Sequence, residues 1–460
     1  MSAAPAWWTA LCGELAPTLA HRRIAVYASG GSPYHHAALI AQWGGVPEPV
    51  SAAQIRAGAL HSYDVLVMPG GGLLAMGGLL APLGVTGSGA IRDWVAGGGV
   101  YIGSCAGAYL PATVPESFAI QHPEIVPLHL LDVPVANGAD GGLGGLDSPG
   151  VGVLRVSVSA PEHRLARGLS AEFEVVHYNG PCFTPNPGAG VTAVTRLVAT
   201  GAAFTPWERS LPGDDTPLVS RLIETHAANV VSGSHGRGTV VLFGSHPEFG
   251  FDVLQLGWDE AAQLFGNALC SGMGQEHANR PTALVSLRLG TVPDDLQYAS
   301  ARFAALAGAA PDLTRAPAFQ GRDAPTLWAE ALGAAVTLTA DTAAYLRALP
   351  HGAVPAACAA WLDHPAAPGQ DYGFVGLRQL TTHLHALLDQ AEAHLRSPPP
   401  PVTSPYGDWN QHPYHLLASS YLSAAGLAAS TALAAGTLGT LSGTRLPPPH
   451  PLFRRRIPHD

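Results

Sequence analysis

Cys105 lies among very small residues in the stretch GSCAG and has the surroundings of a catalytic nucleophile. A nucleophile on a sharp turn between a strand and a helix has a strained backbone, and the residues two before and two after it must be tiny. Gly103 and Gly107 occupy those two places, and the apolar run 100–104 predicts the strand that enters the turn. The same stretch is also compatible with a buried cysteine that packs as a small hydrophobic residue.

His246 is the base that the sequence offers to this thiol. It lies in the stretch 236–250, which reads as a turn, a β-strand and an exposed polar cluster. A histidine there can take the thiol proton, and Glu248 can orient the imidazole and stabilise it when charged. The tripeptide His-Pro-Glu occurs a second time at 122–124, but that copy follows no strand and lies in an irregular region. We therefore favour His246 as the base.

Backbone N–H groups beside the turn would stabilise the negative charge that develops on an attacked carbonyl oxygen. Candidates for this oxyanion hole are the amide of Ala106, directly after the cysteine, and the amides of Gly71 and Gly72 in the stretch MPGGG. The same glycines also suit a simple tight exit from a strand. Tyr34 is a candidate for substrate contact, because the loop expected after the first strand faces the same edge; a solvated loop is the alternative.

Alternating strands and helices must position these residues. Apolar runs predict strands at 23–29, 63–72 and 100–104, and glycine-closed helical patterns predict helices at 37–45 and 90–99. This alternation is typical of an α/β fold with a parallel sheet flanked by helices, a flavodoxin-like sandwich. Loops at the carboxyl ends of such strands hold ligand chemistry. Both the glycine turn and the cysteine turn fall at that edge.

The rest of the chain predicts a change of architecture. The pattern blurs between about 113 and 200, apart from a strand at 151–159, and a helix at 260–269 closes the α/β domain. Beyond about residue 280, Ala- and Leu-rich helices separated by prolines are expected at 296–309, 326–348, 372–396 and 414–436. We therefore place an α/β domain at 20–275 and an all-α domain at 280–460. The all-α domain has no recognisable role beyond packing, or assembly into a homo-oligomer.

Residues 414–444 carry no charge and are long enough to span a membrane. Their Ala, Ser, Thr and Gly content instead favours a buried helix packed closely through small side chains, so we expect no membrane partner. The N-terminus lacks the basic region and the long apolar core of a signal peptide, which makes the cytoplasm the expected location.

Composition excludes several classes of function. The net charge of −10 argues against a nucleic-acid partner. All 23 basic residues are arginines, which rules out a Walker A lysine and Schiff-base chemistry. The five cysteines are widely spaced and contain no CxxC, so neither a disulfide framework nor a zinc ribbon is expected. The histidine pairs 35–36, 383/385 and 412/415 have poor ligand spacing or no acidic or thiol companion, so we expect no metal and no cofactor.

The quoted motifs together resemble a known group. PGGG, then GSCAGAY, then HPE after a strand is similar to the class I glutamine amidotransferase fold with its Cys-His-Glu triad. The N-terminal domain family of biotin-protein ligase is the most similar branch, and HYNGPCF at 177–183 resembles its YNGG stretch. The resemblance covers about 22–272. It implies that Cys105 is the nucleophile, His246 the base and Glu248 its partner, and it adds Asn179 as a substrate contact.

Two departures from these families shape the expected function. Glutamine amidotransferases usually have a glutamine four residues after the cysteine, whereas this chain has Tyr109 there. Tyr109 is a candidate substrate contact, and its presence puts glutamine as the substrate in doubt. The chain also lacks the GRGRxG loop and the lysine of biotin ligases. We expect a cysteine-dependent hydrolase or amidotransferase-like enzyme that acts on an amide or related C–N acyl bond of a small molecule. The alternative is a non-catalytic binding or regulatory module that retains the fold.

Overall fold

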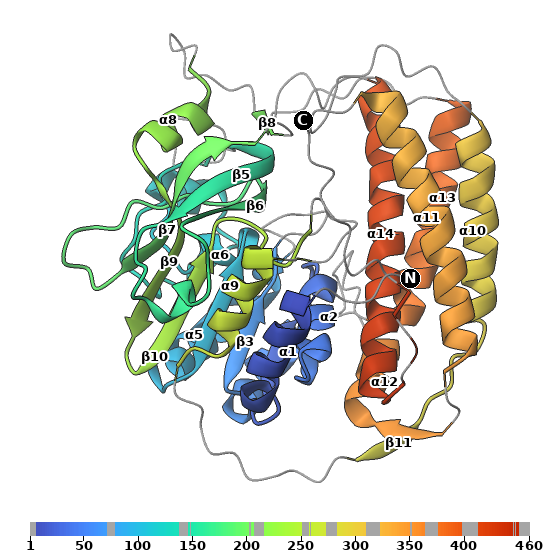
Figure 1. Ribbon diagram of the computed structural model, residues 1–460, viewed down its shortest axis with the longest axis horizontal. Coiled ribbons are helices and arrows are strands. Elements are labelled where there is room, and N and C mark those ends of the chain that lie inside the picture. Colours follow the sequence, from blue (N-terminus) through green and yellow to red (C-terminus); the bar gives the residue numbers. More distant parts are fainter. Residues whose placement is uncertain are drawn as a thin grey trace.

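The computed structural model of the 460-residue chain shows a large sheet with helices on both faces and a helical bundle beside it (Figure 1). The described residues are 6–70, 79–137, 146–147, 149–201, 204–206, 216–250, 257, 259–272, 283–309, 323–349, 352–363, 376–397, 413–444, 446 and 448–449.

The sheet has ten strands in the order β2-β1-β3-β4-β10-β9-β7-β5-β6, with β8 paired to β5. The strands are β1 (Ile24–Tyr27), β2 (Pro47–Val50), β3 (Val65–Met68), β4 (Val100–Ser104), β5 (Gly150–Val158), β6 (Glu172–Tyr178), β7 (Thr192–Thr200), β8 (Thr205–Pro206), β9 (Ala228–His235) and β10 (Gly238–Phe243). Strands β2, β1, β3, β4 and β10 are parallel, and every pairing from β10 onward to β6 is antiparallel. The parallel part has the strand order of flavodoxin-like folds.

Side chains alternate between the two faces of the parallel strands, so each face has its own core. Tyr27, Leu66 and Tyr101 pack with α3 (Ala52–Arg56) and α5 (Gly84–Ala96). The opposite face packs with three helices, α1 (Ala6–Leu19), α2 (Tyr34–Gln42) and α9 (Asp259–Leu269). Shorter helices connect the strands: α6 (Ala106–Tyr109), α7 (Glu116–Gln121), α8 (Leu218–Glu224), and the 3-10 turns Ala59–Ser62, Ala81–Leu83 and Arg164–Ala166.

The bundle consists of four long helices and a small appendage. The helices are α10 (Val292–Gly308), α11 (Ala324–Arg347), α13 (Leu377–Arg396) and α14 (Pro413–Leu441); the appendage is α12 (Ala356–Leu362) with the two-stranded sheet of β11 (Leu284–Ser286) and β12 (Ala353–Pro355). Helix α14 faces the α/β half and packs on α2 (Figure 1). The Trp361 indole N–H donates to the Pro47 carbonyl oxygen at 2.9 Å. The core on the sheet face that packs with α1, α2 and α9 continues into the bundle, so the two halves share one hydrophobic core.

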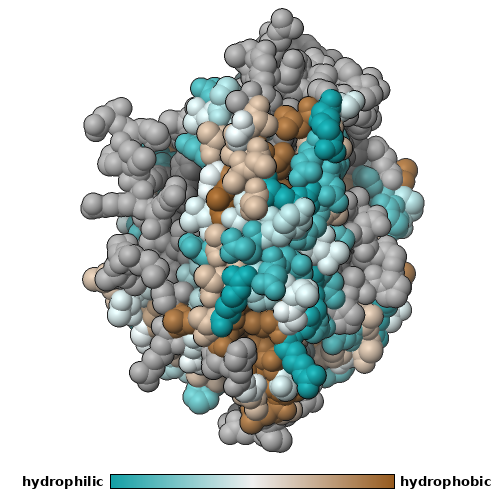
Figure 2. Space-filling view, turned by 90° about the vertical axis from the view of Figure 1, so that its right-hand side faces the viewer, coloured by the Kyte–Doolittle hydropathy of each residue, from teal (hydrophilic) through white to brown (hydrophobic). Residues whose placement is uncertain are grey.

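The bundle buries leucine, aromatic and alanine side chains inside and presents polar ones outside. Hydrophilic side chains form a band along the helices on its outer face (Figure 2). Among the described helices, α14 holds the one window, 424–441, that is long and apolar enough to cross a membrane. Within the protein 83% of that window is buried, as in the core helix of a globular protein.

The predicted α/β fold followed by helices is confirmed, with three differences. The unpredicted antiparallel strands β6, β7 and β9 extend the predicted parallel sheet, and β6 and β7 lie in the region where glycines and prolines blur the sequence pattern. Helix α2 begins at Tyr34 rather than at 37, because Pro33 starts the helix, so Tyr34 lies in a first turn and not in a loop. An additional helix, α1, precedes the sheet and packs on α9.

Candidate active site

Cys105 occupies a strained turn between β4 and α6. Its φ of 50° and ψ of −112° lie outside the regions that a residue with a side chain prefers. A Cβ on Gly103 would overlap the Gly107 carbonyl oxygen, and one on Gly107 would overlap that of Met68. The Tyr101 hydroxyl donates to the Gly107 carbonyl at 2.7 Å and fixes the far side of the turn. These contacts explain why tiny residues flank the cysteine.

The strand register brings three turns to one edge of the sheet. Met68 pairs with Gly103, and Ser104 pairs with Phe243, so β3, β4 and β10 end side by side. The Cys105 amide donates to the Phe243 carbonyl at 2.9 Å, and the thiol donates to the Tyr178 carbonyl at 3.2 Å.

His246 and Cys105 both lie against Gly70, at the end of β3. A Cβ on Gly70 would lie 3.1 Å from the Cβ of Cys105 and would overlap the His246 ring. Glycine at this position therefore leaves room for the thiol and the imidazole to lie against the same backbone.

His246 and Glu248 form a buried ion pair. The Nδ1 of His246 is 2.7 Å from Oε1 of Glu248, and the residues are 4% and 1% exposed. Burial by itself lowers the pKa of the imidazole, but the Glu248 carboxylate and the Cys105 sulfur more than offset this and raise the pKa to about 10. Burial would raise the pKa of Glu248, but His36 and His246 lower it to about 2. The carboxylate therefore stabilises the charged imidazole, which is the form that results when the ring takes up a proton.

His36, on α2, reaches the same pair from the other side. Its Nε2 lies 3.1 Å from the Ser104 hydroxyl and 3.4 Å from Oε2 of Glu248. Burial lowers the pKa of His36, with the Glu248 carboxylate opposing that shift. Burial therefore favours the neutral form of this imidazole, and the neighbouring carboxylate favours the charged form.

Aromatic rings enclose His246. Phe249 stacks on its imidazole with a centroid distance of 4.3 Å and an interplanar angle of 1°. His35 meets Phe249 edge-on at 4.6 Å, and Tyr178 contacts both His246 and Phe249. These apolar ring faces keep water away from the base and hold its plane.

The Tyr109 hydroxyl is held by two hydrogen bonds and does not end in open space. Its hydroxyl donates to the Asn179 carbonyl at 2.9 Å and accepts from the Asn137 amide at 2.9 Å. Asn179 has a φ of 54°, and the tyrosine fixes the turn there. Tyr34 is 2% exposed, and its hydroxyl has no hydrogen-bond partner among the described residues.

The structure places the other predicted residues as follows. Ala106 is the first residue of α6, directly after the nucleophile turn. Gly71 and Gly72 lie outside the described residues. In the second HPE copy, His122 follows α7 at the surface, where its Nδ1 is 3.4 Å from Oε1 of Glu124. Cys182 is fully buried in the hydrophobic core, and burial raises its pKa to about 12.

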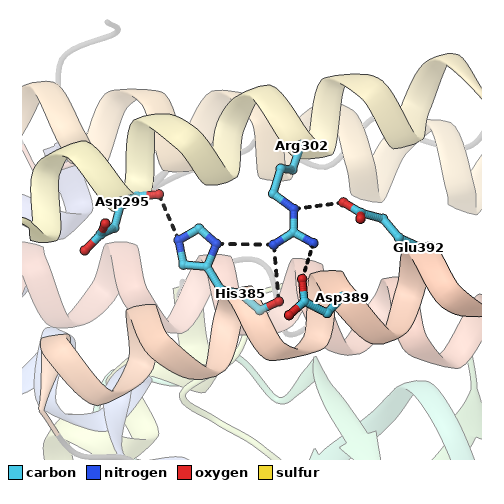
Figure 3. A network of polar contacts seen from close by, with 5 residues as sticks. All are labelled: Asp295, Arg302, His385, Asp389 and Glu392. Carbon is cyan, nitrogen blue, oxygen red and sulfur yellow. Dashed lines mark hydrogen bonds and ion pairs between the residues drawn. The ribbon is translucent and has the colours of Figure 1, made fainter.

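A second polar cluster joins two helices of the bundle (Figure 3). Arg302 of α10 donates to Glu392 at 2.8 Å and to Asp389 at 2.6 Å, both on α13. The two ring nitrogens of His385 face Arg302 and the Asp295 carbonyl, which leaves neither for a metal. These residues and Tyr298 line an open hollow of about 420 Å³. Because all three nitrogens of the guanidinium group contact residues of α13, the cluster is a clamp between helices.

Sequence reasoning missed His36 and Ser104. In the sequence the histidine pair 35–36 reads only as a poor metal site. A usable signal was present, because Ser-Pro at 32–33 is typical of a helix start and places His36 in the first turn at the sheet edge that carries the chemistry. His177 was also missed: it is fully buried on β6, its Nδ1 lies 3.3 Å from the Ser245 hydroxyl, and burial lowers its pKa to about 3.

Residues 49–126 match the family model described as biotin-protein ligase, N terminal. The matched segment contains the strand and the turn that carry Cys105, and it ends before His246 and Glu248. The resemblance to this family that the sequence shows is thereby confirmed over these residues. No curated protein matches the chain.

Solved structures similar to the chain cover 54% of it. A GMP synthase subunit from Thermoplasma acidophilum is 14% identical, with 94% of its own chain covered and a TM-score of 0.34. The glutaminase domain of CTPS from Trypanosoma brucei is 13% identical, with 93% covered and a TM-score of 0.33. A ThuA-like protein from Bacteroides uniformis is 13% identical, with 89% covered and a TM-score of 0.33.

Proposed function

We propose that this protein is a cysteine-dependent hydrolase that cleaves an amide or related C–N acyl bond of a small molecule. The observation that carries the proposal is the strained turn of Cys105 beside the buried His246–Glu248 pair. A strained nucleophile with a base and an orienting carboxylate is the arrangement that acyl transfer requires. The proposal includes the cytoplasmic location expected from the sequence.

The reaction would run in two halves. His246 takes the thiol proton, and the Cys105 sulfur attacks the acyl carbon, with the Ala106, Gly71 and Gly72 amides stabilising the oxyanion. The C–N bond breaks, the amine leaves with the proton from His246, and a thioester remains on Cys105. Water then attacks the thioester with His246 as base, which releases the acid and restores the thiol.

The position of Tyr109 argues for a substrate amide other than glutamine. The hydroxyl of Tyr109, which stands where amidotransferases usually have a glutamine, is occupied by Asn137 and by the Asn179 carbonyl. The rings of Phe249 and Tyr178 beside the base suit an acyl group with apolar surface.

A panel of carboxamides, glutamine included, tests the proposal by release of ammonia or amine. Wild-type protein should release it from at least one amide, and mass spectrometry should find an acyl adduct on the Cys105 peptide. Cys105→Ser should abolish both signals, and Cys12→Ser, at a half-buried thiol on α1, should keep both. Absence of release and adduct across the panel would favour a binding module without turnover.

A further inference from the structure

The Glu248 carboxylate has two oxygens in different situations. Oε1 lies 2.7 Å from Nδ1 of His246, whereas Oε2 is buried and has no hydrogen-bond partner among the described residues. A buried carboxylate oxygen without a donor is costly and leaves the group free to rotate about its bond to the chain. Nε2 of His36 lies 3.4 Å from Oε2 and can supply a donor.

His36 can supply that donor because of where its ring nitrogens lie. Two oxygens face Nε2, those of Ser104 and Glu248, and Nδ1 has no hydrogen-bond partner among the described residues. The Glu248 carboxylate can only accept, and Nδ1 faces no acceptor among the described residues, so the proton of a neutral imidazole lies on Nε2; a charged imidazole carries a proton there as well. The charged or titratable groups that interact with the ring are Glu248 and His246; on its other side it meets Phe265 of α9 edge-on at 5.1 Å.

We propose that His36 is a positioning residue of the proposed triad, whose Nε2–H holds the Glu248 carboxylate in line with His246 and contacts Ser104 beside the nucleophile. The inference rests on the proposed function. With Oε2 held, Oε1 stays directed at His246, and the imidazole stays directed at the Cys105 sulfur. Helix α2, which carries His36, is packed between the sheet and α14, so the bundle supports the helix that positions the triad.

Three substitutions separate this role from simple packing. His36→Gln keeps a donor, because its side-chain amide reaches the position of Nε2. His36→Phe keeps the ring and its contact with Phe265 but has no N–H. His36→Asn is the second donor-less variant, because its shorter amide reaches only the position of Nδ1, and it replaces His36→Phe if that variant fails to fold.

The readout is the rate at which iodoacetamide alkylates Cys105 in the full chain, measured by mass spectrometry over a range of pH around neutrality. We expect His36→Phe to slow alkylation at neutral pH by about tenfold, the equivalent of one hydrogen bond to a charged group, and to move the pH profile upward. His36→Gln should stay within about twofold of wild type. A packing role alone would lower the unfolding temperature and leave the pH profile in place.

The possible failures are distinguishable. If Cys105 of the wild type reacts no faster than the other four cysteines, the proposed function is overturned, and this inference with it. If Cys105 is reactive in the wild type and unchanged in His36→Phe, only the role of His36 is overturned. Equal losses in His36→Phe and His36→Gln would also overturn it, because the donor would then be irrelevant.

Discussion

The tripeptide His-Pro-Glu occurs twice in this chain, in two very different settings. His246 and Glu248 follow β10, are buried, and lie 2.7 Å apart. His122 and Glu124 follow the surface helix α7, with side chains 36% and 52% exposed and 3.4 Å apart. The residue types and spacing are the same, so the difference comes from what surrounds them.

Burial is what gives the first copy its chemistry. In water an ion pair gains little, because solvent screens the charges, whereas a buried pair interacts strongly and shifts both pKa values. Position matters equally, since the end of β10 lies beside the end of β4, where Cys105 stands. A motif therefore becomes a site only where the fold both buries it and gives it a partner.

The largest contrast is expected from removing the carboxylate in each copy. Glu248→Gln leaves the His246 imidazole buried without its counter-charge and should lower the free energy of unfolding by about 3 kcal/mol or more. Glu124→Gln removes a screened surface pair and should change it by less than about 0.5 kcal/mol. Denaturant titration of both variants at neutral pH measures the two values, and equal effects would contradict the comparison.

The same pair should make stability depend on pH. Glu248, whose pKa falls from 4.5 to about 2 on folding, adds stability above pH 4.5 that is lost as the pH falls toward 2. His246, whose pKa rises from 6.5 to about 10, adds stability below pH 6.5 that is lost as the pH rises toward 10. The contribution is thus greatest between 4.5 and 6.5. Glu248→Gln should flatten both slopes, and Glu124→Gln should leave them in place.

Two glycines extend the comparison to smaller effects. Gly103→Ala would push a methyl group into the Gly107 carbonyl and should lower the free energy of unfolding by about 1–3 kcal/mol. At Gly89, on α5, an added Cβ meets nothing within 4 Å, so Gly89→Ala should raise it by about 0.5–1 kcal/mol. Thermal unfolding of the two variants gives the signs, and a tolerated Gly103→Ala would mean that the turn is looser than its geometry indicates.

Patterns among neighbouring residues in the sequence were sufficient to predict the strand that leads into the nucleophile turn. The predicted strand 100–104 has the same bounds in the structure. An apolar run between glycines and a cysteine indicates a buried strand of a parallel sheet. The His246–Glu248 copy was preferred over the second one because a strand precedes it. Both inferences depend on residues that are adjacent in the chain.

Contacts between distant segments were not predictable in this way. His36 meets Glu248 across more than two hundred residues of chain, and nothing near His36 in the sequence signals a buried carboxylate. The antiparallel strands β6 and β7 pair through a region whose glycines and prolines conceal the strand pattern. The packing of α14 on α2 in one shared core was also not predictable. Small side chains can pack closely against many partners, so the sequence of α14 does not indicate which one it meets.

The central claim is that His246 activates Cys105, and the most direct test compares all five cysteines in one alkylation experiment. Burial raises the pKa of the other four thiols, to about 11 for Cys12, about 12 for Cys182 and Cys358, and upward for Cys270. At neutral pH Cys105 should therefore react about tenfold faster than any of them. His246→Ala should slow Cys105 and reduce that lead, and His122→Ala should preserve it in full. A Cys105 that reacts no faster than the others, or that is not slowed in His246→Ala, would contradict the account.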